Sequence, residues 1–159
     1  MKNTTLCYIC KDKKILMLYR NKKKIDVNKG KWIGVGGHFL EGETAEECLL
    51  REVYEETGLM LTQYRLMGKL NFFIDDIEEV CFLYKAYDFT GEIIDCDEGI
   101  LEWIDESKIL ELPLWEGDYL FLNRLLHEDD YFEMTLIYKK DKMIEWRIEN
   151  DISEINSNC

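Results

Sequence analysis

The sequence predicts a single α+β domain, and three observations carry that prediction. Its 159 residues suit one hydrophobic core. Apolar residues make up 47% of the chain and proline occurs once, so enough surface can be buried to offset the entropy of ordering. Strand-like stretches alternate with two stretches of helical periodicity, and no Gly/Ser/Pro-rich linker divides them. We therefore expect one domain over residues 1–149, followed by a polar C-terminal tail over residues 150–159.

The chain begins with the pattern of a β-hairpin. Thr4–Cys10 and Lys14–Arg20 are apolar, are rich in β-forming residues, and flank the polar turn Lys11-Asp12-Lys13. Residues 21–31 form a loop with five lysines, and Trp32–Gly36 is a short segment before the first helix.

A helix is predicted over Glu43–Thr57. Thr44 is the candidate N-cap, Glu47 completes a capping box three residues later, and Gly58 stands just past the end. The stripe expected to pack on the core consists of Ala45, Cys48, Leu49 and Val53.

The second half of the chain predicts further strands and one more helix. Strand-like stretches cover Tyr64–Ile74, Glu79–Phe89 and Ile100–Ile104. Leu114–His127 carries apolar residues at helical spacing, among them Leu120, Leu122 and Leu125. Tyr131–Tyr138 and Met143–Ile148 predict a late hairpin.

The charge excludes some classes of partner. Twenty Lys and Arg residues against 33 Asp and Glu residues give a net charge of −13, which repels nucleic acid polymers and anionic membranes. A small anionic ligand remains possible, because a bound divalent cation inverts the local electrostatics. The sequence shows no membrane-spanning run and no signal peptide. We expect a cytoplasmic protein with a small-molecule partner.

The six cysteines lack the dense spacing of a disulfide scaffold, so reduced thiols are expected. Cys7 and Cys10 form a C-x-x-C, the spacing of some redox and zinc sites. They fall within a predicted strand, where residues three apart face opposite sides, and this disfavours both roles.

The predicted first helix carries a cluster of acids. Glu52, Glu55 and Glu56 stand at i, i+3 and i+4, so their carboxylates share one face and repel one another. Arg51 can pair with Glu55, but one guanidinium cannot neutralise three carboxylates. Clustered oxygen ligands are what Mg²⁺ or Mn²⁺ prefers, particularly where phosphates complete the shell. The alternative is a solvated acidic face.

The surrounding residues resemble a known family. Gly37-x5-Glu43-x7-Arg51-Glu52-Val53-x-Glu55-Glu56-x-Gly58-Leu59 matches the pattern of the Nudix hydrolases at every fixed position. This resemblance implies an α/β/α sandwich with a mixed central sheet. It also implies metal-dependent cleavage of a nucleoside diphosphate linked to another group.

The resemblance assigns roles to particular residues. It implies that Glu52, Glu55 and Glu56 bind the metal, Mg²⁺ or Mn²⁺ in its place, with the Gly36 carbonyl as a further ligand. Glu43 and Arg51 would support them, Arg51 by orienting carboxylates with its planar fork. Glu56 and Glu98 are both candidates for the general base, and Glu98 is a further candidate metal ligand. The alternative for Glu98 is an acid in a turn.

Two segments outside the motif resemble the MutT-type branch, which hydrolyses oxidised purine nucleoside triphosphates. Trp32-Ile33-Gly34-Val35-Gly36-Gly37-His38 is similar to the entry to the motif in that branch, and Leu114-Trp115-Glu116-Gly117-Asp118 is similar to a base-recognition segment of the mammalian members. The substrate-binding residues implied are Thr5, Arg20, Gly36, Gly37, His38, Trp115, Glu116 and Asp118.

Within the second segment, Trp115 would stack on a purine, and Glu116 or Asp118 would hydrogen-bond its edge. The alternative for Trp115 is packing at the start of a helix. The chain departs from the mammalian pattern at Ile33, where those relatives carry an amide, and at Gly117, where they carry an acid.

The resulting expectation is a Mg²⁺-dependent enzyme of nucleotide pool sanitation. It would cleave an oxidised purine such as 8-oxo-dGTP to the monophosphate and pyrophosphate. The alternatives are a Nudix hydrolase of a sugar nucleotide or dinucleotide, and a non-catalytic module that senses a nucleotide. The lysines of the loop, Lys22, Lys23, Lys24, Lys29 and Lys31, would steer a triphosphate towards the site, or are simply solvated.

Overall fold

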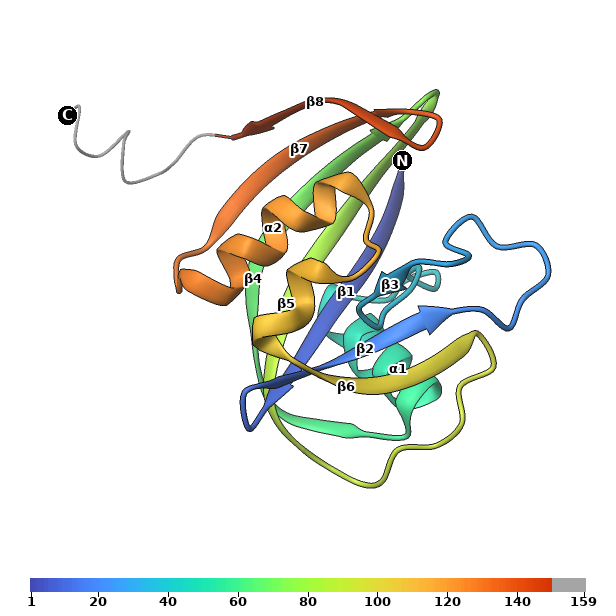
Figure 1. Ribbon diagram of the computed structural model, residues 1–159, viewed down its shortest axis with the longest axis vertical. Helices are drawn as coiled ribbons and strands as arrows, with labels where there is room; N and C mark the ends of the chain where they lie inside the picture. Colours follow the sequence, from blue (N-terminus) through green and yellow to red (C-terminus); the bar gives the residue numbers. More distant parts are fainter. Residues whose placement is uncertain (150–159) are drawn as a thin grey trace.

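A mixed β-sheet between two helices organises the computed structural model, which describes residues 1–149 (Figure 1). The strands are β1 (Lys2–Lys11), β2 (Lys14–Arg20), β3 (Trp32–Ile33), β4 (Met60–Ile74), β5 (Ile77–Thr90), β6 (Gly99–Asp105), β7 (Phe132–Lys139) and β8 (Lys142–Ile148). The helices are α1 (Ala45–Thr57), the 3₁₀ helix η1 (Glu106–Glu111) and α2 (Glu116–His127).

The strands run in the order β3-β2-β1-β5-β4-β7-β8, and β6 pairs with β2 off this path. The β1–β5 and β4–β7 pairs are parallel, and the other pairs are antiparallel. The expected mixed sheet is therefore confirmed, as are both predicted hairpins.

Alternation along β1 and β2 divides the core into two halves. Cys7, Ile9, Leu16 and Leu18 pack with Leu49 and Val53 of α1. Tyr8, Ile15 and Met17 pack with Phe121, Leu122 and Leu125 of α2. Successive strand residues point to opposite faces, so each helix covers its own face of the sheet. The arrangement is the expected α/β/α sandwich.

The same alternation accounts for the C-x-x-C. Cys7 lies in the α1 half of the core and Cys10 packs against the α2 half, so the two thiols are on opposite faces of β1, as predicted. Cys7, Cys10, Cys48, Cys81 and Cys96 are all free thiols. Cys159 and the rest of the predicted tail lie outside the described residues.

Helix α1 has the predicted ends. Thr44 has an extended backbone and its side chain accepts from the Glu47 amide, while the Glu47 carboxylate accepts from the Thr44 amide. Gly58 adopts a left-handed conformation, with φ 82°, that closes the helix. The helix begins at Ala45 rather than Glu43, because the capping conformation of Thr44 is not helical.

Other boundaries differ modestly from the prediction. Strand β4 begins at Met60, four residues before the predicted start, because its first residues pair with the end of β5. Helix α2 begins at Glu116 rather than Leu114, since Trp115 takes the extended N-cap conformation. Helix η1 was not predicted. Among residues 1–149, every helix is too short or too polar to cross a bilayer.

Replacing the cap should destabilise the protein without affecting the sheet. We expect Thr44→Ala to lower the free energy of unfolding by about 1 kcal/mol, because the Glu47 amide at the start of α1 loses its side-chain acceptor. Thr44→Ser keeps the capping oxygen and should cost much less. Urea unfolding of the three proteins measures the difference, and equal midpoints for the Ala and Ser variants would contradict the capping role.

Candidate active site

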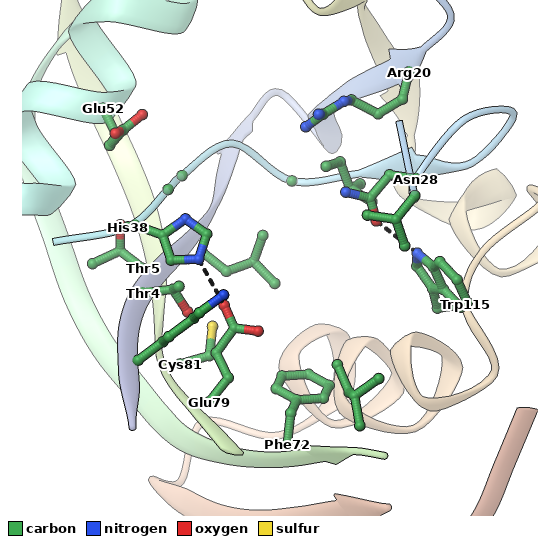
Figure 2. Close-up of a pocket in the computed structure, with 18 of the residues that line it drawn as sticks. Thr4, Thr5, Arg20, Asn28, His38, Glu52, Phe72, Glu79, Cys81 and Trp115 are labelled. Atoms are coloured by element: carbon green, nitrogen blue, oxygen red, sulfur yellow. Dashed lines mark hydrogen bonds and ion pairs between the residues drawn. The ribbon is translucent and has the colours of Figure 1, made fainter. Parts of the chain in front are cut away.

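A cavity of about 840 Å³ runs from the start of the Nudix-like motif to helix α2 (Figure 2). The predicted site residues that line it are Thr5, Arg20, Gly36, Gly37, His38, Glu52, Glu56, Glu98, Trp115 and Asp118. They come from β1, β2, the loop before α1, α1 itself, the segment before β6 and the start of α2. The fold thus gathers residues far apart in sequence around one space.

The segment before α1 is drawn tightly against strand β1. The Thr5 amide donates to the Gly37 carbonyl at 2.9 Å, and a Cβ atom at Gly36 would overlap the Thr5 carbonyl. A Cβ atom at Gly37 would lie 2.5 Å from the carboxyl carbon of Glu52. Glycine is required at Gly36 by the close approach of the Thr5 backbone, and at Gly37 the space that a side chain would take is filled by a motif carboxylate.

Arg51 holds the acids of the motif in place. Its Nε and Nη2 donate to the two carboxylate oxygens of Glu43, at 2.7 and 2.9 Å. Its Nη1 donates to Glu52 at 2.8 Å and to Glu55 at 3.1 Å, which confirms the predicted Arg51–Glu55 pair. Nη2 also donates to the His38 carbonyl. The hydrogen bonds from Arg51 hold the pKa of Glu43 down at about 2.

Glu56 and Glu98 form a second carboxylate group inside the cavity. Glu56 is 9% exposed and accepts a hydrogen bond of 2.9 Å from the Gly36 amide. Burial, together with the neighbouring Glu98 carboxyl, raises the pKa of Glu56 to about 9 against the lowering effect of the Gly36 amide. Glu98 also pairs with Arg20 at 3.1 Å and with Lys23 at 3.2 Å. The fold therefore brings Glu98 beside the motif.

The carboxylates suit a hard cation by their chemistry. Glu52, Glu56 and Glu98 supply oxygen donors on one cavity, the donor type that Mg²⁺ and Mn²⁺ bind. The side chain of Glu55 is 58% exposed, is held by Arg51 and does not line the cavity. Within residues 1–149, no three acidic, thiol or imidazole side chains meet as a preassembled metal cluster. The roles of these residues as ligands stay predictions.

The opposite end of the cavity is bounded by Trp115. Its indole Nε1 donates to Asn28 Oδ1 at 2.8 Å (Figure 2), and Lys31 Nζ lies 5.3 Å from the ring centroid. The ring packs edge-on against Tyr138, with centroids 6.0 Å apart. Trp115 is the N-cap residue of α2 and also lines the cavity. Packing at the start of the helix is therefore confirmed, and stacking on a purine stays a prediction.

A chain of hydrogen bonds along the cavity wall was not visible in the sequence. Arg20 donates to both oxygens of Asp26, at 2.8 and 3.1 Å, and Asp26 accepts from the Asn28 amide. Asn28 in turn holds Trp115, while Arg20 also reaches Glu98. This wall network therefore joins the acidic end of the cavity to the aromatic end.

The two acids of the predicted base-recognition segment have different surroundings. Asp118 is 6% exposed and lines the cavity, and no group of residues 1–149 hydrogen-bonds to its carboxyl. Burial raises the pKa of Asp118 to about 8. Glu116 is exposed, accepts from the Met143 amide at 3.3 Å, and does not line the cavity. Helical geometry turns Glu116 away while Asp118 points inward, so only Asp118 fits the predicted contact.

The remaining lining residues include several that the sequence did not single out. Glu79 pairs with His38 at 3.4 Å near the middle of the cavity (Figure 2), and Phe72 of β4 and Tyr138 of β7 complete the aromatic end. Of the loop lysines, Lys22 donates to the Cys96 carbonyl and Lys23 pairs with Glu98. Electrostatic steering by this loop stays a prediction.

Together, the sandwich fold and the cavity flanked by a glutamate-rich helix are the arrangement that the resemblance to the Nudix hydrolases implies. Comparison with known proteins gives the family. The model of the NUDIX domain matches residues 2–125. The oxidized purine nucleoside triphosphate hydrolase of Danio rerio is 30% identical over 129 residues, which cover 80% of this chain and 83% of that protein. The chain belongs to the Nudix family.

Two further relatives extend over nearly the whole chain. An uncharacterized Nudix hydrolase of Bacillus subtilis (strain 168) is 26% identical over 156 residues, 94% of this chain and 95% of that protein. A crystal structure of a MutT protein from Bacillus halodurans has a TM-score of 0.86 and 27% identity, covering 95% of this chain and 99% of the other. The chain is a Nudix hydrolase of MutT type.

The buried carboxyl of Asp118 should make stability depend on pH. Its pKa is raised from 3.8 to about 8 on folding, so the folded state binds the proton more tightly and stability is lost as pH rises across this range. Asp118→Asn carries no ionisable group at this position. As the pH rises from about 4 to about 9, we expect its free energy of unfolding to increase relative to that of the wild type by on the order of 2–5 kcal/mol.

Denaturant unfolding at several pH values measures how the difference in free energy of unfolding between the variant and the wild type changes with pH. Asp141→Asn, at an exposed turn position, is the matched control and should run parallel to the wild type. Parallel curves for Asp118→Asn as well would mean that this carboxyl is ionised in the folded protein at no cost.

Proposed function

We propose that this protein hydrolyses purine nucleoside triphosphates to the monophosphate and pyrophosphate with Mg²⁺, or Mn²⁺ in its place, and that it prefers an oxidised purine such as 8-oxo-dGTP. The observation that carries the proposal is the single cavity with carboxylates at one end and an aromatic, hydrogen-bonding end at the other. A nucleotide has the same polarity, with phosphates at one end and a flat base at the other.

At the aromatic end, this chain's own residues offer base recognition. The face of Trp115 provides a stacking surface worth about 1–3 kcal/mol for any base, since every base has a π-face. The Asp118 carboxyl, which has no hydrogen-bond partner within residues 1–149, provides a directional contact to a base edge. Asn28 fixes the indole, so the stacking surface is positioned before the ligand arrives.

At the acidic end, Glu52, Glu56 and Glu98, with the Gly36 carbonyl, would hold the cation. When bound, a divalent cation screens the phosphate charge and lowers the pKa of bound water. Arg51 fixes Glu52 through Nη1 and is itself fixed by Glu43, so one carboxylate faces the cavity in a defined orientation. Glu56 and Glu98 both lie where a side chain could accept the proton of the attacking water.

The relatives support this substrate class. The proteins of Danio rerio and Mus musculus carry the name oxidized purine nucleoside triphosphate hydrolase, and a relative from Buchnera aphidicola is named 8-oxo-dGTP diphosphatase. Two features of this chain favour altered base contacts, Ile33 in place of an amide and Gly117 in place of an acid.

A product-resolved substrate screen tests the proposal. Purified protein with Mg²⁺ should convert 8-oxo-dGTP to 8-oxo-dGMP and pyrophosphate with a higher kcat/KM than dGTP, sugar nucleotides or dinucleoside polyphosphates. Faster cleavage of a sugar nucleotide or dinucleotide would assign a different Nudix activity. Equal rates on dGTP and 8-oxo-dGTP would remove the sanitation role, and binding without turnover would indicate a sensor.

Glu56→Gln separates metal-dependent chemistry from folding. The glutamine oxygen can still accept from the Gly36 amide, so the fold should be retained, while loss of a charged ligand should lower kcat at least about a hundredfold. The rise in melting temperature with Mn²⁺ should shrink in parallel. Glu41→Gln, at an exposed position in the same motif, is the control. Wild-type turnover in Glu56→Gln would place the cation elsewhere.

A further inference from the structure

Side chains of strand β7 leave no room for a side chain at Gly117. A Cβ atom at Gly117 would lie 2.8 Å from the Tyr138 hydroxyl oxygen and 3.0 Å from a methyl of Leu136. Gly117 is the second residue of α2, and Tyr138 is the last residue but one of β7, twenty-one residues further along the chain. The space that an acidic side chain would need at position 117 is therefore taken by a phenol.

The Tyr138 hydroxyl is held firmly but has a hydrogen to give. It accepts a hydrogen bond of 2.7 Å from the Gly117 amide, and its ring is fixed edge-on against Trp115. Tyr138 is 5% exposed and lines the cavity. Among residues 1–149, no group accepts its O–H hydrogen. A buried phenol left without an acceptor is costly unless a ligand supplies one.

Burial also keeps this hydrogen in place. It raises the pKa of Tyr138 to about 12. The hydroxyl is consequently a donor throughout the neutral range. Asp118 follows Gly117 directly in the chain and also lines the cavity, so a donor and a carboxyl line the same cavity as Trp115.

We propose that Tyr138 is a specificity-determining residue that donates its O–H to the 6-oxo group of a guanine-type base, while Asp118 takes the adjacent ring N–H. The inference rests on the proposed purine nucleotide function and names the base class. Guanine presents an acceptor at O6 next to a donor at N1, complementary to this pair. Adenine presents an amino donor at C6, which would face the phenolic donor and leave a buried hydrogen bond unmade.

Oxidation at C8 lies on the other side of the purine from this edge. Tyr138 thus selects the base and does not read its oxidation, which separates the proposal from the preference for 8-oxo-dGTP.

The test removes the phenolic oxygen from the protein and the O6 acceptor from the ligand. Tyr138→Phe is assayed with dGTP and with 2-aminopurine deoxyribonucleoside triphosphate, which lacks O6 and therefore also the N1 hydrogen; the change in ratio between wild type and variant isolates the contact that involves Tyr138. In the wild type, guanine should be preferred. In the variant, the ratio of the two kcat/KM values should fall about tenfold, mostly through KM for dGTP, because a hydrogen bond to a buried neutral group is lost. Any general loosening by the variant affects both ligands and cancels in the ratio.

Two more variants keep the test decisive. Tyr131→Phe removes an exposed hydroxyl that bonds to Glu133 and should leave the ratio unchanged. Gly117→Ala would push the Tyr138 hydroxyl aside and should lower the ratio in the same direction, even if Tyr138→Phe proves unstable. An unchanged ratio in both Tyr138→Phe and Gly117→Ala overturns the assignment.

A binding measurement distinguishes this inference from the proposed activity. Calorimetric titration with dGMP and with 2-aminopurine deoxyribonucleoside monophosphate requires no turnover. If the protein hydrolyses another class of nucleotide but Tyr138→Phe still lowers the preference for dGMP, the proposed substrate fails and the base assignment stands. If the wild type does not favour dGMP, the assignment fails whatever the enzyme hydrolyses.

Discussion

The arrangement of the acidic side chains in the site depends on the hydrogen bonds of Arg51. The chain has a net charge of −13, and the motif places several acids on one short helix. Further carboxylates from other segments lie close to that helix. One guanidinium donates to Glu43, Glu52 and Glu55 and to the His38 carbonyl, so a single cation organises the outer acids and ties the helix to the loop before it. A lysine could not do this, because its ammonium lacks the planar fork that engages Glu43 with two parallel bonds.

In the described part of the chain, Glu56 has no such cation beside it, since it lies inside the cavity and away from Arg51. Its carboxyl is accommodated by the Gly36 amide and by uptake of a proton or of a cation, the two ways in which a buried carboxyl avoids an uncompensated charge. Gly36 can present its amide there only because the loop runs in contact with Thr5 of β1. The glycines of the motif and its glutamates are thus parts of one packing arrangement, in which backbone approaches to β1 create the room that the carboxylates fill.

Local features of the sequence were sufficient for most of the fold. The hairpins, the capped helix α1 and the opposite orientation of Cys7 and Cys10 follow from alternation, helical periodicity and end signals within about 15 residues. The position of Glu98 beside Glu56 did not follow from such signals and was expected only from the family resemblance. Glu116 shows the limit of that resemblance, because its segment matches while the start of α2 turns its side chain towards β8.

The contacts that local signals could not reveal are those between distant segments. Asn28 and Trp115 are 87 positions apart, and nothing in a lysine-rich loop indicates that one asparagine supports a tryptophan. The sequence around Tyr138 predicts only a strand of the late hairpin. The position of its hydroxyl depends on Gly117, which belongs to another element. Such pairs depend on which strands become neighbours, and this is decided by the packing of the whole sheet.

The wall network links several of these distant contacts into one chain of hydrogen bonds and ion pairs. Arg20 is held on one side by two bonds to Asp26 and on the other by Glu98, and Asp26 holds the backbone of Asn28. The side chains of Arg20 and Asp26 are 13% and 3% exposed, so water cannot readily replace either partner. The same chain of bonds therefore connects Trp115 with Glu98, so the side chains at the aromatic and acidic ends of the cavity are held by shared partners. For the proposed nucleotide hydrolase this link would be useful, since a base seated at one end would lie against the network that holds a carboxylate at the other.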